Sequence, residues 1–416
     1  MPLRLLGLFL IGACIGAAVN LGIYRLAYLR RRISPWSRTC GRLPPRGLFD
    51  RVPIVGWWNL RREAKIHGRG FWIRPMLLEL VFGIGIAALY WLEIGELIIN
   101  IAPQFPGVRP GGAAAMTLVH YQFAIHVVLL ALMAMATFID IDEQTVPDAI
   151  TIPGTIIGLS IAALCSAPVL PLLEIGGQQP DVRDLTSPLR FDYPTEAATF
   201  LASPWSLVLG LALYLGWCFA LLPRRWRTGV GILKAWRVMW RRIAARPEKN
   251  WMLPIAVIGC AGIVGAWCGG GQGWRGLFSA LVGLAVGGGI IWLIRLIGGA
   301  VLKREAMGFG DVTLMAMIGA FFGWQPVLIV FFISPFVGAV VGLLQWILIG
   351  ENVIPFGPFL CLGALATLVF WAAVWDYASE LFQVQWLVPS AIAICLPLLG
   401  AMLYGWQRLR ERISGE

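Results

Sequence analysis

Charged side chains are scarce in this chain of 416 residues. Aspartate, glutamate, lysine and arginine together make up 13% of the sequence, and only three histidines are present. An ordinary soluble domain is about a quarter charged. Hydrophobic residues reach 58%, and the mean hydropathy is +0.77. This balance excludes a set of soluble domains and predicts a membrane protein.

Paired cysteines are also absent. The eight cysteines are scattered and form no CxxC pair, which excludes a thioredoxin-like redox motif and a zinc knuckle. The apolar N-terminal stretch has no A-x-A cleavage site and leads into Tyr24, Arg25 and a basic loop. We therefore interpret it as a retained first span, not as a signal peptide.

Long apolar runs recur along the whole chain. Each approaches the length needed to cross about 30 Å of hydrocarbon. We predict an all-α polytopic fold with about eleven transmembrane helices, at 3–26, 76–98, 115–138, 148–169, 205–222, 252–268, 276–299, 312–323, 325–349, 355–376 and 387–405. The short run at 312–323 is expected to form a helical hairpin with the next one.

The net charge of +11 is explained by topology and does not call for a nucleic-acid partner. Lys and Arg collect in loops that stay in the cytoplasm. Residues 25–74 carry thirteen Lys or Arg against two acids, and residues 223–250 carry nine against one. Residues 171–204 carry two Lys or Arg against five acids, so we expect an irregular external loop there. With the N-terminus outside and the C-terminus in the cytoplasm, every basic loop falls in the cytoplasm and the acidic loop falls outside.

The basic stretch 223–250 allows two interpretations. Its apolar side chains recur at helical spacing with Lys and Arg between them. One interpretation is an amphipathic helix lying on anionic inner-leaflet lipids. The other is a packed cytoplasmic helix.

Two groups of acidic residues lie at predicted span ends, where ionisable side chains are costly and commonly functional. The first comprises Asp140, Asp142 and Asp148, and the second comprises Glu305 and Asp311. The span count puts both groups at the cytoplasmic edge. Carboxylates that are 171 residues apart could therefore meet.

Two carboxylates that lie close together tend to share one proton, because both cannot ionise cheaply. The ionised one can draw a proton from water, and the protonated one can donate to a peptide carbonyl. Gly308 and Gly310 would leave the backbone beside Asp311 open to an extended substrate. Solvated caps at helix N-termini are an equally good interpretation of the same acids.

The motifs around these acids resemble the bacterial prepilin peptidases, the type IV leader peptidases of the Gly-x-Gly-Asp membrane aspartic protease class. The Gly-x-Gly-Asp sequence at 308–311 opens a span, and Asp140 stands seven residues before Pro147. Residues 16–26 are similar to the opening of that family, and residues 354–359 to its Ile-Pro-Phe-Gly-Pro element. Further residues follow the order of the family through the first cytoplasmic loop: Asp50, Pro53, Trp57, Leu60, Arg61, Arg74 and Glu79.

The resemblance implies an aspartic endopeptidase of the bacterial cytoplasmic (inner) membrane, with Asp140 and Asp311 as its catalytic pair. It implies that the substrates are type IV prepilin or type II secretion pseudopilin precursors, cut after a short basic leader that ends in glycine. Glu305 either tunes Asp311 or is a plain surface acid. Supporting or helix-capping roles are implied for the remaining motif residues: Gly308, Gly310, Asp142, Asp148, Pro147 and Glu305.

The chain also departs from the family. Members often carry two CxxC pairs in the first cytoplasmic loop, which suit tetrahedral zinc. Here that loop has Cys40 alone with His67 as a distant second candidate, so we expect no zinc and no metal site. The family also N-methylates the new N-terminus. S-adenosylmethionine is the cofactor implied if this activity is retained without the cysteines, and proteolysis needs no cofactor.

The resemblance divides the chain into three regions. Residues 1–114 are the predicted N-terminal membrane region, associated with methylation in the family, with its basic loop at 27–75. Residues 115–376 are the predicted peptidase core, interrupted by an insertion at 171–270. Residues 377–416 add a last span and a tail. Because the insertion contains an even number of spans, Asp140 and Asp311 stay on the same side.

Two rival functions stay open at this point. Membrane carboxylates can relay protons in a multi-span transporter, but the repeated halves with broken helices that mark many transporters are missing. The chain could also be an inactive membrane scaffold of a secretion system, with the basic insertion as its docking surface.

Overall fold

A computed structural model of the protein describes residues 2–29, 33–36, 46–95, 112–164, 172–176, 179–183, 199–222, 252–302, 307–348, 355–384 and 386–414. Three features predicted from the sequence lie outside these residues. They are Cys40, Glu305 and the basic stretch 223–250.

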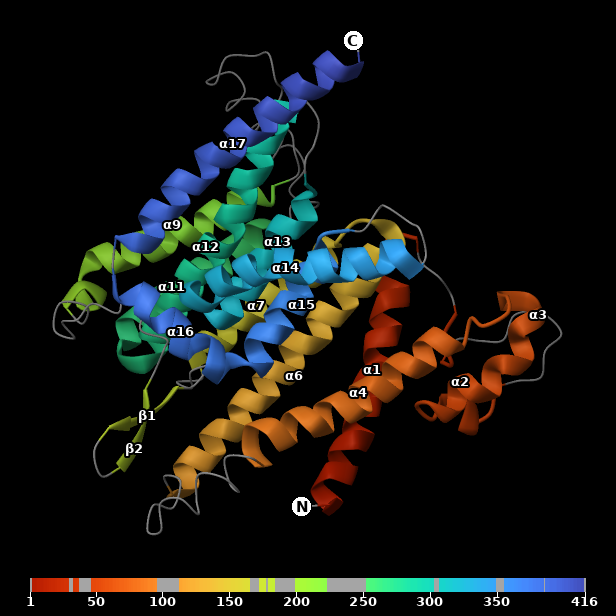
Figure 1. Cartoon of the computed structure of the whole chain (residues 1–416). Coiled ribbons are helices and arrows are strands. Elements are labelled where there is room, and N and C mark those ends of the chain that lie inside the picture. The colour runs from red at the N-terminus through yellow and green to blue at the C-terminus, as the bar shows by residue number, and fades with distance from the viewer. Residues whose placement is uncertain are drawn as a thin grey trace.

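Eleven apolar helices form a bundle within the described part of the chain (Figure 1). Seven are long and apolar enough to cross a membrane: α1 (Pro2–Leu26), α4 (Ile73–Tyr90, extended by a π-helical turn at Trp91–Gly95), α6 (Gly112–Glu143), α11 (Met252–Gly269), α12 (Gly271–Leu302), α14 (Trp324–Leu348) and α17 (Leu387–Ser414). Four are shorter: α7 (Asp148–Leu164), α9 (Pro204–Ala220), α13 (Phe309–Phe322) and α15 (Gly357–Val369). The all-α polytopic prediction is confirmed, and each of these helices overlaps one predicted apolar run.

The remaining elements are small. The loop after α1 holds η1 (Phe49–Arg51), α2 (Val55–Leu60), η2 (Arg61–Glu63) and α3 (Ala64–His67), and α16 (Trp371–Gln383) lies between α15 and α17. Strands β1 (Leu172–Gly176) and β2 (Gln179–Arg183) pair as an antiparallel hairpin. The prediction of an irregular loop over 171–204 is therefore wrong for this hairpin, because backbone pairing gives it order that its mixed composition does not signal.

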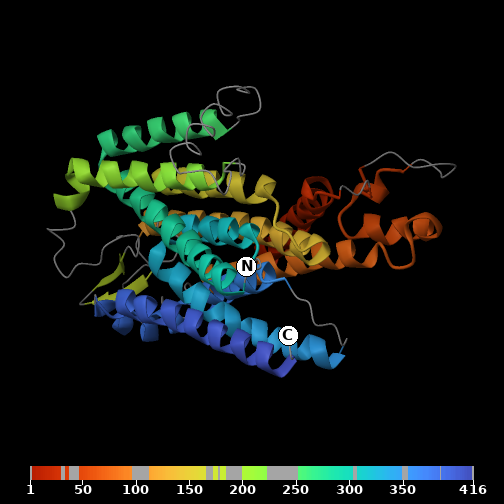
Figure 2. The same cartoon turned by 90° about the horizontal axis from the view of Figure 1, so that it is seen from above.

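Helix α12 lies at the centre of the bundle. It contacts α7, α9, α11, α13, α14 and α17. Figure 2 shows α9 and α11 along one side of it and α17 along the other. Its closest approach is to α13, where Gly283 and Gly319 put the two backbones so near that a Cβ on either would overlap a carbonyl oxygen of the other helix. Small residues allow this approach between membrane helices.

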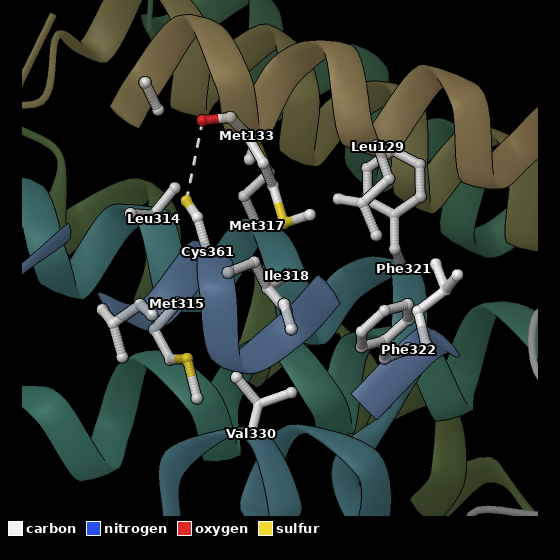
Figure 3. Packing of buried hydrophobic residues seen from close by; sticks show 14 of the residues in the cluster. Leu129, Met133, Leu314, Met315, Met317, Ile318, Phe321, Phe322, Val330 and Cys361 are labelled. Carbon is white, nitrogen blue, oxygen red and sulfur yellow. Dashed lines mark hydrogen bonds between the residues drawn. The ribbon is translucent and has the colours of Figure 1, made fainter. Parts of the chain in front are cut away.

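Helix α13 is enclosed by its neighbours. Every residue from Asp311 to Phe322 is buried, as expected for a helix that is apolar on all sides. Figure 3 shows its side chains, such as Met317 and Phe321, packed among those of α6, α14 and α15. Gly323 ends it at φ 83° and leads into α14. The predicted hairpin of two helices is present.

One predicted span is divided in the structure. The run 355–376 was expected as a single helix, but α15 ends at Val369 and α16 starts at Trp371. Phe370 breaks the helix at φ −101° and ψ 22°. The second piece is amphipathic and contains Asp376 and Glu380, so it is less suited than α15 to continue through hydrocarbon.

Buried hydrogen bonds attach the first loop to the bundle. The Glu79 carboxylate on α4 accepts hydrogen bonds from Trp57 Nε1 (2.7 Å), Asn20 Nδ2 (3.0 Å) and the Ile54 backbone N–H (2.5 Å). One acceptor group thereby joins α1, α2 and α4. The start of α1 and the end of α17 lie at opposite ends of the bundle (Figure 1).

We expect Glu79→Ala to release α2 from the membrane region, since two buried side-chain donors and the half-buried Ile54 amide would lose their acceptor. A buried donor without a partner costs about 1–3 kcal/mol. Limited trypsin digestion at Arg61 and Arg62 should become at least several-fold faster. Leu77→Ala, on the exposed face of α4, is the control. Equal digestion of both variants would contradict this role of Glu79.

Candidate active site

The first acidic group lies where α6 ends and α7 begins. Asp140 is in the last turn of α6, and its side chain is 3% exposed. The helix ends after Glu143 because Gln144 takes a left-handed conformation at φ 54° and Pro147 follows, whose missing N–H cannot continue the helix. Helix α7 starts at Asp148, an acid favoured by the positive end of the helix dipole.

The second acidic group opens α13. Gly308 precedes the helix in an extended conformation, and Asp311 in the first turn is 8% exposed. Gly310 lies against the Val146 backbone, where a Cβ would come within 3.0 Å of its N and O atoms. The missing side chain thus lets α13 pack onto the connection between α6 and α7. Close packing, and not only access for a substrate, explains this glycine.

Asp140 and Asp311 lie near each other at this junction. Their carboxyl groups interact electrostatically, and both also act on the thiol of Cys361 in α15. Cys361 is buried, and its Sγ donates a hydrogen bond to the Met133 carbonyl oxygen at 3.6 Å (Figure 3). Helices α6, α13 and α15 therefore surround one pair of acids.

The start of α15 completes the enclosure of Asp140. Its first residue is Gly357, from the Ile-Pro-Phe-Gly-Pro element, and the Gly357 backbone amide interacts with the Asp140 carboxyl group. A Cβ at position 357 would overlap Oδ2 of Asp140 and touch Val146. Only glycine lets the backbone come this near.

The acid pair is held away from water. Oδ2 of Asp140 is buried and has no hydrogen-bond partner among the residues that the structure describes. An unpartnered buried charge is expensive. An arrangement in which the two acids share one proton avoids part of this cost, which is the state that acid–base chemistry on water requires.

The supporting residues are arranged around the pair with different partners. Arg74 Nη1 donates to Oδ1 of Asp142 at 2.6 Å, and its Nη2 donates to the Phe138 carbonyl oxygen at 3.1 Å. Asp142 therefore helps Arg74 to brace the last turn of α6. Asp148 is exposed at the start of α7, and the buried Pro147 accepts the N–H of Ile150 through its carbonyl oxygen.

Ion pairs order the described part of the first loop. Arg46 binds Glu63 at 2.6 Å with both side chains buried, and Arg62 binds Asp50 at 2.6 Å. Burial acts to raise the pKa of Asp50, but hydrogen bonds from Arg62 and Gly47 and the charges of Arg62 and Arg46 outweigh it and hold that pKa below its usual value. Within the described residues no group of three or more metal-ligating side chains occurs.

Three residues beside the acids were not given a role from the sequence. In the sequence, Gly357 and Arg74 stand only as positions within the motifs, and Cys361 is only one of the eight scattered cysteines. Their contacts join segments that are far apart in the chain. Only the two prolines around the glycine that opens α15 signalled a special backbone at Gly357.

Residues 249–343 match the type IV leader peptidase family. The chain is 35% identical over 97 residues to a "Prepilin leader peptidase/N-methyltransferase" of Pseudomonas aeruginosa, covering 23% of this chain and 32% of that protein. A protein of the same name from Burkholderia pseudomallei is 42% identical over 84 residues, or 20% of this chain and 26% of the relative. A "Type 4 prepilin-like proteins leader peptide-processing enzyme" of Escherichia coli O78:H11 is 32% identical over 145 residues, which cover 34% of this chain and 52% of that protein.

These matches confirm the predicted resemblance to prepilin peptidases over part of the chain. The chain spans about a quarter to a half of the length of these relatives. Their names do not favour a transporter or a scaffold. No solved structure matches. With its apolar helices and these bacterial relatives, the protein is a multi-pass protein of the bacterial cytoplasmic membrane.

We expect Gly357→Ala to destabilise the fold by about 1–3 kcal/mol, the usual cost of overpacking, because the methyl group would overlap Asp140. Gly308→Ala is the matched control, since its Cβ would make an ordinary 3.5 Å contact with Asp311. Reversible denaturation in mixed micelles gives both free energies of unfolding. Equal stability of the two variants would show that α15 does not confine Asp140.

Proposed function

We propose that this protein is an aspartic endopeptidase in which Asp140 and Asp311 form the catalytic pair. The observation that carries the proposal is the nearness of two buried carboxyl groups from α6 and α13, one of which has an oxygen without a hydrogen-bond partner among the described residues. The match of residues 249–343, which include Asp311, to the leader peptidases supports it.

The chemistry follows from one shared proton. The ionised aspartate takes a proton from water while the water oxygen attacks the peptide carbonyl carbon, and the protonated aspartate gives its proton to the carbonyl oxygen. In the collapse of the resulting gem-diol, the first acid passes its proton to the leaving nitrogen as the C–N bond breaks. The second acid takes a proton back from a gem-diol hydroxyl, which restores the starting state.

The proposed substrates are prepilin or pseudopilin precursors, because the relatives are named as prepilin leader peptidases. The cut would fall after the glycine that ends a short basic leader, on the cytoplasmic side. The products would then enter type IV pilus or type II secretion assembly. Anionic inner-leaflet lipids are proposed as further partners through the basic stretch 223–250.

N-methylation of the new N-terminus with S-adenosylmethionine is a second part of the proposal. Its support is the N-methyltransferase in the names of the relatives. The methylation would fall to the predicted region 1–114, and proteolysis to the predicted core 115–376. Residues 249–270 of the predicted insertion lie inside the family match, so the insertion boundary stays a prediction.

Asp140→Asn and Asp311→Asn should each lower cleavage of a prepilin-type precursor by about 10²–10⁴-fold, the usual contribution of a positioned acid or base. Asparagine keeps the shape of the side chain and removes the titrating group. Leader loss is followed by mass spectrometry after reconstitution in vesicles, and one additional methyl group on the product would show N-methylation.

The matched control is Glu93→Gln, which neutralises a carboxylate that contacts His126. His126 lies on α6 roughly 20 Å along the helix axis from Asp140. This variant should cleave within about twofold of the wild-type rate, since it lies outside the acid pair. Normal processing by either aspartate variant would overturn the assignment.

A further inference from the structure

Arg295 is a charged residue inside an apolar helix. It is the one charged residue of α12 between Gly276 and Leu302, and it is partly buried. It lies seven residues before the end of the helix, which is about 10 Å along the axis. A guanidinium at such a depth is costly and commonly functional. An arginine with no partner in the protein would extend its head toward water.

The guanidinium of Arg295 instead contacts the connection between α12 and α13. Its Nε donates a hydrogen bond to the Met307 carbonyl oxygen at 2.9 Å, and its Cζ lies 5.6 Å from the centroid of the Phe309 ring. Hydrogen bonds from a charged donor are roughly twice as strong as neutral ones. Arg295 therefore holds the residues on both sides of Gly308.

One peptide group joins Arg295 to Asp311. The Met307 carbonyl and the Gly308 N–H belong to the same planar trans peptide, in which they point in opposite directions. The Gly308 N–H donates a hydrogen bond to the Asp311 carboxyl group. Asp311 is the third residue of α13 and Gly308 its N-cap, so this bond is one half of a capping box. Arg295 thus acts on Asp311 through a single peptide.

The other acid of the pair is served differently. Asp140 interacts with the Gly357 amide, and the carbonyl oxygen of that peptide, on Phe356, accepts two amides from the first turn of α15 at 3.0 and 3.2 Å. That helix therefore fixes the peptide by itself. Met307 precedes the N-cap of α13, and the first intrahelical bond goes to the N-cap carbonyl. The Met307 carbonyl therefore needs a donor from another element.

We propose that Arg295 is a positioning residue for the cleavage reaction, and that it holds the Gly308 N–H against the Asp311 carboxylate. The assignment rests on the proposed function. Whichever acid starts with the shared proton, Asp311 is ionised in one part of the proposed cycle, and the fixed N–H then stabilises its charge and its orientation. Because Arg295 bonds to the backbone of the enzyme, substrate binding does not depend on it.

The kinetic test compares two arginines of the same helix. Arg295→Met keeps an apolar stem and removes the donor, and Arg275→Met is the matched control at an exposed site about 30 Å away along α12. With a prepilin-type precursor in vesicles, Arg295→Met should lower kcat by about 10–100-fold and leave KM within about twofold. Arg295→Lys restores a cationic donor and should bring kcat within about threefold of the wild type. Arg275→Met should change neither constant by more than about twofold.

Hydrogen exchange tests the contact without proteolysis. Exchange at the Gly308 amide is followed in the full chain by mass spectrometry with fragmentation to single residues. Arg295→Met should speed this exchange at least about tenfold, because the peptide is released, and Arg275→Met should leave it within about twofold. Unchanged exchange in Arg295→Met would overturn the proposal.

Two kinetic results would also overturn it: a higher KM with unchanged kcat in Arg295→Met, or a loss of kcat that Arg295→Lys does not restore. If Arg295→Met fails to insert into the membrane, Arg295→Gln is judged by the same limits. Faster exchange at Gly308 in the variant, with no cleavage by the wild type, would instead reject the proposed function and leave the anchoring of Gly308 by Arg295 standing.

Discussion

The site depends on one close contact among three helix ends. The connection after α6 presents Val146, and two glycines meet it: Gly310 at the start of α13 and Gly357 at the start of α15. A side chain at either glycine would push one helix away, and Asp140 or Asp311 would move with it. The acid pair is therefore a consequence of backbone packing, and the Asp residues themselves contribute little to bringing the helices together.

Burial makes ionisation of these two acids costly. Helix α13 is enclosed on all sides, so Asp311 enters an apolar environment that an isolated charge would avoid. A protein gains nothing in stability from two buried acids, and such costs persist mainly where they serve a function.

The apolar helices were predictable because hydrocarbon imposes length and composition on each span separately. The hairpin of α13 and α14 followed from the shortness of the run at 312–323. Contacts between remote segments were not predictable in this way: nothing local indicates that Gly357 touches Asp140 or that Arg46 pairs with Glu63. The β-hairpin at Leu172–Arg183 was missed because backbone pairing, not a periodic pattern, gives it order. The break at Phe370 was missed because the apolar run continues across it.

The spacing of the acid pair can be measured directly in a cysteine-free background that carries Asp140→Cys and Asp311→Cys. A short bis-thiosulfonate linker should bridge the two thiols, so that the intact mass gains one linker and no free thiol remains. A Glu93→Cys and Asp311→Cys pair should instead react with two separate linkers. Separate reaction of the thiols at positions 140 and 311, with no bridged species, would contradict the meeting of the two acids on which the account depends.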